Sequence, residues 1–95
     1  MLKQTGSFKT QFASKYLQQL CKHFAHKVKV EYDSQQGDVN FPFGKACLFA
    51  QEGALIVHIS AEDDDALAKA RSVIDVHLKT FAFREDFDEM EWRDV

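Results

Sequence analysis

Apolar residues recur at helical spacing in the first third of the chain. Across residues 14–27 they return at positions i, i+3, i+4 and i+7, while lysine and glutamine occupy the opposite side. The stripe consists of Ala13, Tyr16, Leu17, Leu20 and Phe24. Residues 3–10 alternate weakly, as an edge strand does. The pattern therefore predicts a strand followed by an amphipathic helix.

The next thirty residues change to a period of two. Apolar and polar side chains alternate in four short runs, which predicts four strands. The runs cover residues 28–32, 39–43, 46–50 and 55–59. Turns are expected at residues 34–38, at Gly44 and at residues 52–53. Pro42 has no backbone donor, so its strand should lie at an edge of the sheet or end there.

A second helix has a clear start signal. Ser60 and Asp63 have the spacing of a capping box, and residues 62–65 are all acidic, which the positive end of the helix dipole favours. A single apolar stripe follows, formed by Leu67, Ala70, Ile74, Leu78 and Phe81. This helix, like the first, should bury one face.

The order strand, helix, four strands, helix favours a two-layer α+β domain. In that fold an antiparallel sheet carries both helices on one face, because each helix has one stripe to bury. The 95 residues should make a single domain with one modest core. Residues 86–95 contain Phe87, Met90 and Trp92 among acidic residues, and fit either a last strand or a packed tail.

Composition narrows the class of protein. A hydrophobic content of 45% with nine phenylalanines is typical of a folded protein. There is no run of about 18 apolar residues, so no membrane span is expected. The N-terminus lacks the features of an export signal, which favours a cytoplasmic location. Cys21 and Cys47 are then expected as reduced thiols, too few for a paired-cysteine zinc site.

The net charge of −3 hides an asymmetry between the two halves of the chain. Residues 1–45 carry a balance of +4 and residues 46–95 a balance of −7. This is consistent with two solvated surfaces that happen to differ, or with a dipolar molecule that steers a charged partner or self-associates. No Lys/Arg cluster is dense enough to neutralise phosphates, so no nucleic-acid partner is expected.

Two aromatic–basic segments suggest a family. Residues 16–27 read YLQQLCKHFAHK, and residues 77–85 read HLKTFAFRE. Together with Gly37, Phe41 and Gly44, they resemble a bacterial family of uncharacterised small proteins, domain of unknown function 2218. The resemblance covers nearly the whole chain. It implies a standalone domain or a partner of siderophore-interacting flavoproteins, which hints at iron handling, and it brings no catalytic residues.

Three histidines are candidate ligands of a metal or haem. His23 and His26 lie about 60° apart on a helix and could share an ion, with His77 as a third ligand. Cys21 points about 160° away from His23 and cannot join them. The structural alternative is that His23 flanks the core, His26 lies in solvent near the helix C-terminus, and His77 packs beside the second stripe.

The strands that flank residues 52–53 predict an interaction surface. A two-residue turn pairs Cys47 with His58 and Phe49 with Ile56, and all four then face away from the helices. Large apolar side chains on a solvated face indicate a contact patch. The pairing also brings the Cβ atoms of Cys47 and His58 to about 5 Å, near enough for an imidazole to lower the pKa of a thiol as in a Cys–His enzyme, although no third orienting group is visible.

We therefore expect a non-enzymatic binding or accessory module without a cofactor. Its surface would be the patch of Cys47, Phe49, Ile56 and His58, and its partner another protein or a second copy in a homodimer. A metal- or haem-binding protein that uses His23 or His26 with His77 is the second hypothesis. A thiol enzyme built on Cys47 and His58 is the third.

Overall fold

The computed structural model describes all 95 residues as a six-stranded sheet with two α-helices. In chain order the elements are β1 (Leu2–Lys9), α1 (Ala13–Phe24), β2 (Lys29–Tyr32), β3 (Gln36–Phe41), β4 (Gly44–Gln51), β5 (Ala54–Ala61), α2 (Asp64–Phe81), the 3₁₀ helix η1 (Phe83–Glu85) and β6 (Glu91–Asp94). Every strand pair is antiparallel, and the order in the sheet is β2-β3-β4-β5-β1-β6. The predicted order of elements is confirmed, with β6 added at its end.

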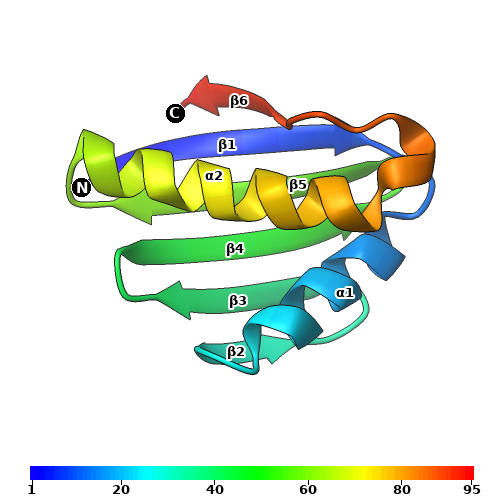
Figure 1. Cartoon of the computed structure of the whole chain (residues 1–95), viewed down its shortest axis with the longest axis horizontal. Coiled ribbons are helices and arrows are strands. Elements are labelled where there is room, and N and C mark those ends of the chain that lie inside the picture. The colour runs from blue at the N-terminus through cyan, green and yellow to red at the C-terminus, as the bar shows by residue number, and fades with distance from the viewer.

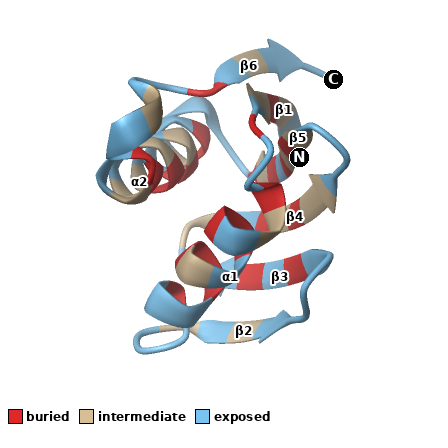
Figure 2. Ribbon diagram, turned by 90° about the vertical axis from the view of Figure 1, so that its right-hand side faces the viewer, coloured by how far each residue is buried: buried red, intermediate tan, exposed pale blue.

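Both helices lie on the same face of the sheet (Figure 1 and Figure 2). Helix α1 packs mainly on β2, β3 and β4, and α2 mainly on β5, β4 and β1. This layering follows from the single apolar stripe on each helix. Leu20, Val57 and Ile74, one from each packed element, are fully buried between the layers. The predicted two-layer α+β architecture is confirmed.

The register of β4 against β5 is set by their two-residue turn. Gly53 adopts φ 82°, a left-handed conformation that favours glycine in such turns. Leu48 then pairs with Val57, and both point toward the helices with no exposed surface. On alternate positions Cys47 pairs with His58 and Phe49 with Ile56. The predicted register is confirmed.

The C-terminal residues pack on the helix side of the sheet. Phe87 and Met90 are buried in the core, and β6 pairs with β1 at the sheet edge. The Asp75 carboxylate of α2 accepts hydrogen bonds from the Met90 backbone (3.0 Å) and from Trp92 Nε1 (2.9 Å). The Trp92 ring lies over Gly6, where an added Cβ would come within 2.7 Å of it. The tail is thus both a last strand and part of the core.

The start of α2 differs from the prediction. Ser60 does not cap the helix, because it belongs to β5 and pairs there with Lys3. Asp63 is the N-cap instead, and its side chain accepts the Ala66 N–H at 2.8 Å. The capping-box interpretation of Ser60 was therefore wrong, since the strand continues further than the alternating pattern indicated.

Two other boundaries also shifted. Helix α1 ends at Phe24, and residues 25–27 form a turn rather than a last helical stretch. Strand β3 begins within the predicted turn, because the Asp33 carboxylate accepts the N–H groups of both Gln35 and Gln36 and closes the turn early. The strand ends immediately before Pro42, as the missing backbone donor predicted.

Truncation of the α2 stripe tests this packing. We expect Ile74→Ala to lower the free energy of unfolding by about 2–5 kcal/mol, because it opens a cavity between α2 and the sheet. Val76→Ala on the same helix is the matched control, since Val76 is 59% exposed and its truncation should change stability by less than about 0.5 kcal/mol. Urea denaturation measures both. Equal effects of the two substitutions would show that α2 does not bury this face.

Candidate functional site

The side of the sheet without helices carries the predicted patch. We call Cys47, Phe49, Ile56 and His58 the outer patch. The Phe49 and His58 rings meet edge to face with their centroids 5.5 Å apart. Three of the four side chains are half-buried among their neighbours on the face, and His58 is exposed. Helices α1 and α2 and the C-terminal residues Phe87, Met90 and Trp92 pack on the other side, so no helix or strand covers this patch; only the exposed terminal residue, Val95, borders it, beside Cys47 and His58.

His58 is oriented by a hydroxyl from the next strand. Its Nδ1 lies 2.8 Å from Thr5 Oγ1, on β1, which pairs directly opposite His58. This hydroxyl fixes the orientation of the ring. A general base that activates a nucleophile is commonly oriented by a further polar group, such as a carboxylate. The arrangement therefore gives the His58 ring a fixed position but supplies no carboxylate of the kind that completes a catalytic triad.

The Cys47 thiol is held in its protonated form. Burial, followed by a hydrogen bond to the Asp38 side chain and the charge of that carboxylate, raises the pKa of Cys47 above its ordinary value, and Lys45 offsets this only in part. Asp38 lies opposite Cys47 on β3. The thiolate is the reactive form of cysteine, so a thiol with a raised pKa is a weak nucleophile. The geometry does not support a Cys47–His58 enzyme.

Alkylation by iodoacetamide checks the state of this thiol. We expect Cys47 to react more slowly at neutral pH than a free cysteine peptide, and Asp38→Asn to accelerate it by about tenfold for each unit by which the pKa falls. Cys21 is fully buried and its pKa is raised to about 12, mainly by burial, so it should stay unmodified. Glu31→Gln, which removes a neighbouring charge opposite Asp38, is the control. An activated Cys47 would instead react faster than the peptide.

The charged side chains of the outer face are mostly basic. By strand register the face carries five basic and three acidic residues, which are Lys3, Lys9, Lys29, Lys45, Arg93, Glu31, Asp38 and Glu91. Since the whole chain has a net charge of −3, the rest of the molecule is strongly acidic. The asymmetry between the halves of the sequence thus becomes an asymmetry between the faces of the domain.

The candidate metal ligands are only partly brought together. His23 of α1 and His77 of α2 lie side by side, with ring centroids 4.6 Å apart. His26 lies in the exposed turn after α1 and does not line the same hollow. No three His, Cys, Asp or Glu side chains gather where they could hold a metal ion. A metal site would need a third ligand beyond the two adjacent imidazoles.

The two imidazoles line a groove of about 370 Å³ on the helix side. We call it the histidine groove. It lies between the C-terminal end of α1, the middle of α2 and the β3–β4 turn. Its nine lining residues are His23, Phe24, Lys27, Val28, Phe41, Pro42, Phe43, Val73 and His77. The wall is thus largely aromatic, and its single permanent charge is the ammonium of Lys27.

The protonation of the groove follows from its contacts. His77 Nδ1 lies 2.7 Å from the Val73 carbonyl, which can only accept, so Nδ1 carries a proton and Nε2 faces away from the helix backbone. His23 is exposed, but the loss of some water around its ring, together with the nearby charges of His77, Lys27 and His26, lowers its pKa. The neutral form of the His23 ring is therefore favoured.

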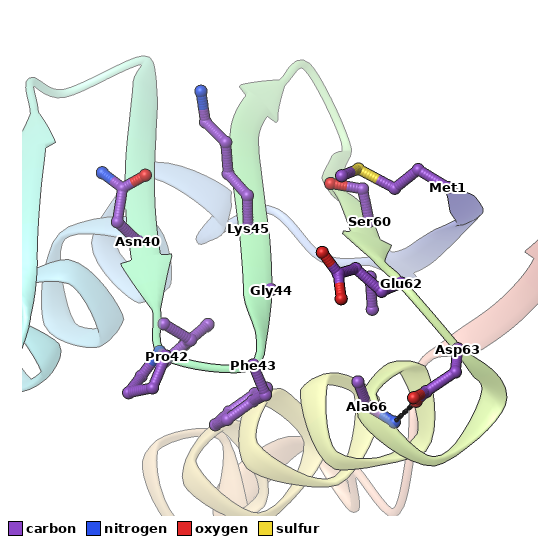
Figure 3. Close-up of a pocket in the computed structure, with 12 residues that line it drawn as sticks. Met1, Asn40, Pro42, Phe43, Gly44, Lys45, Ser60, Glu62, Asp63 and Ala66 are labelled. Carbon is purple, nitrogen blue, oxygen red and sulfur yellow. Dashed lines mark hydrogen bonds between the residues drawn. The ribbon is translucent and has the colours of Figure 1, made fainter.

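Across the β3–β4 turn lies a second and wider hollow of about 490 Å³ (Figure 3). Lys45, Asn40 and Glu62 are among the residues that line it, so its charges are mixed. It also borders the start of α2, where the Asp63 side chain already accepts the Ala66 N–H, as the dashed line shows. These side chains do not converge on one point in the view, so this hollow offers no comparable site.

A pH series tests the environment of His23. Because its pKa is lower in the folded than in the unfolded protein, the folded state binds this proton less readily. The contribution of the neutral ring to stability should be complete above about pH 6.5 and decline as the pH falls through the folded pKa. Urea denaturation of the wild type and His23→Gln between pH 5 and 8 should show the wild type losing more stability. If the stability of the two proteins changes equally with pH, the pKa of His23 is not lowered by folding.

Sequence reasoning missed the partners that fix these side chains. Thr5 and Asp38 contact His58 and Cys47 from other strands, and Lys27, Phe41 and Phe43 complete the groove. The alternation of residues 3–10 could have indicated Thr5 as the partner of His58 only if β1 were already known to pair with β5. No signal in the sequence gave that strand order.

The fold and its surfaces define a small two-layer α+β domain with one uncovered sheet face and no cluster of metal ligands. The chain belongs to the family described as "Uncharacterized protein conserved in bacteria (DUF2218)", which matches residues 5–93. The predicted resemblance is confirmed. The NMR structure of PA4090 from Pseudomonas aeruginosa is similar, with 30% sequence identity and a TM-score of 0.81 over 98% of this chain and 96% of that one.

No curated protein matches the chain. None of its helices combines the length and the apolar character required to cross a membrane.

Proposed function

We propose that this domain is a non-enzymatic binding module that docks a partner protein against the outer patch. The observation that carries the proposal is the position of Phe49 and Ile56, paired side by side on the two central strands, on a sheet face that no helix covers. Full burial of such side chains is worth roughly 1.5–3 kcal/mol each, of which the half-buried residues realise only a part. A partner that buries both side chains fully would gain the rest of this free energy.

Charge favours a different protein over a second copy. The outer face carries five basic and three acidic side chains, so two such faces brought together would repel each other. A surface with an apolar centre and a rim of carboxylates complements it in both respects. The link to iron handling that the family resemblance implies suggests one such candidate, a siderophore-interacting flavoprotein.

The other two hypotheses have less support. A metal-binding role rests on His23 and His77 alone, because the third expected ligand, His26, lies outside their groove. A thiol enzyme would need an activated Cys47, and the contact with Asp38 acts in the opposite direction.

Affinity capture from a bacterial lysate tests the docking face. We expect the wild type to retain a partner whose binding weakens with added salt, and Phe49→Ser or Ile56→Ser to weaken it by at least about tenfold, as the loss of a central contact does. Val76→Ser removes an equally apolar but exposed residue on α2 and should leave binding unchanged. Circular dichroism verifies that each variant is folded.

Light scattering on the purified protein separates the two kinds of partner. A monomeric wild type is expected at micromolar concentration. If the wild type is instead a dimer, and Phe49→Ser dissociates it, the partner of the outer patch is a second copy of this chain. If the wild type is a monomer and Phe49→Ser captures the same proteins as the wild type, the outer patch is not a docking face.

A further inference from the structure

We infer that the histidine groove is a binding site for a small planar aromatic acid. The groove lies on the helix side of the sheet, opposite the outer patch, so this site is independent of the docking proposed above. It differs from the other four main hollows of the surface in combining aromatic walls on several elements with one cationic side chain at the rim.

The walls present ring faces and edges to a flat ligand. Phe41 and Phe43 lie parallel, with centroids 5.1 Å apart and planes inclined by 7°. Phe24 meets both Phe41 and His77 edge to face at 5.1 Å. Phe41 and Phe43 remain only half-buried, so apolar ring surface still faces the groove. Another aromatic ring could extend this arrangement in the offset or edge-to-face geometry that such rings prefer.

The charge of the groove selects an acid. Lys27 is the only charged residue of its lining, and it lies close enough to His23 to contribute to the lowered pKa of that ring. A carboxylate on the ligand can pair with this ammonium, whereas a cation would be repelled. A volume of about 370 Å³ is near the lower end of small-molecule sites, which fits one or two fused rings.

Titration with 2-naphthoate, followed by amide NMR spectra at pH 7, tests the inference. Saturable shifts are expected at residues around the groove, such as His23, Phe43 and His77, and not at the outer patch. The saturated analogue, decahydro-2-naphthoate, should bind more weakly because it lacks the aromatic contacts. The uncharged analogue, 2-naphthamide, should also bind more weakly because it cannot pair with Lys27.

Two pairs of variants assign these contributions. Phe43→Leu keeps an apolar side chain but removes the ring, and should weaken 2-naphthoate binding by about two- to tenfold. Phe83→Leu is its control, because Phe83 is exposed and lies outside the groove. Lys27→Gln should abolish the preference for naphthoate over naphthamide. Lys22→Gln, on α1 but outside the groove, should retain that preference.

Several results would overturn the inference. Equal binding of the saturated analogue would show a generic apolar surface, and shifts centred on Phe49 would place the ligand on the outer patch. An unchanged affinity in a folded Phe43→Leu variant, or no saturable binding at all, would exclude the groove as the site. Since none of these experiments involves a partner protein, they leave the docking proposal to be judged on its own.

Discussion

The register of β4 against β5 is the constraint on which the rest of the structure depends. A two-residue turn at Gly53 places Leu48 and Val57 together under the helices. A slip by one residue would send these side chains to solvent, at roughly 1.5–3 kcal/mol each, and would turn Cys47 and His58 inward. The register of β4 against β5 therefore determines both which residues form the core and which form the outer patch.

Burial on one side leaves the other side open. Each helix has a single apolar stripe, and the C-terminal strand adds Phe87, Met90 and Trp92 to the same layer. Both helices and the apolar residues of the C-terminal segment therefore pack on the helix side, and none of them covers the outer face. The Asp75 carboxylate, which accepts hydrogen bonds from Met90 and Trp92, keeps the tail there. An uncovered sheet with a basic rim is the consequence.

The packing of the two helices creates the second surface. Helices α1 and α2 share the sheet, so the end of one and the middle of the other bring His23 and His77 into ring contact. The β3–β4 turn closes this space with Phe41 and Phe43. The result is an aromatic groove on the side of the domain opposite the outer patch. A small-molecule site and a protein-docking face can therefore coexist without competing.

The sequence alone determined the elements, the layer order and the β4–β5 register, because period, turn chemistry and a single stripe per helix are local properties. It also indicated the outer patch residues and named His23, His26 and His77 as candidate ligands. Only the tertiary structure decided that His77 meets His23 without His26, that Asp38 restrains Cys47, and that Thr5 orients His58. Those contacts join residues far apart in the chain. They depend on strand order and helix placement, which are set by the packing of the whole core and have no local signature in the sequence.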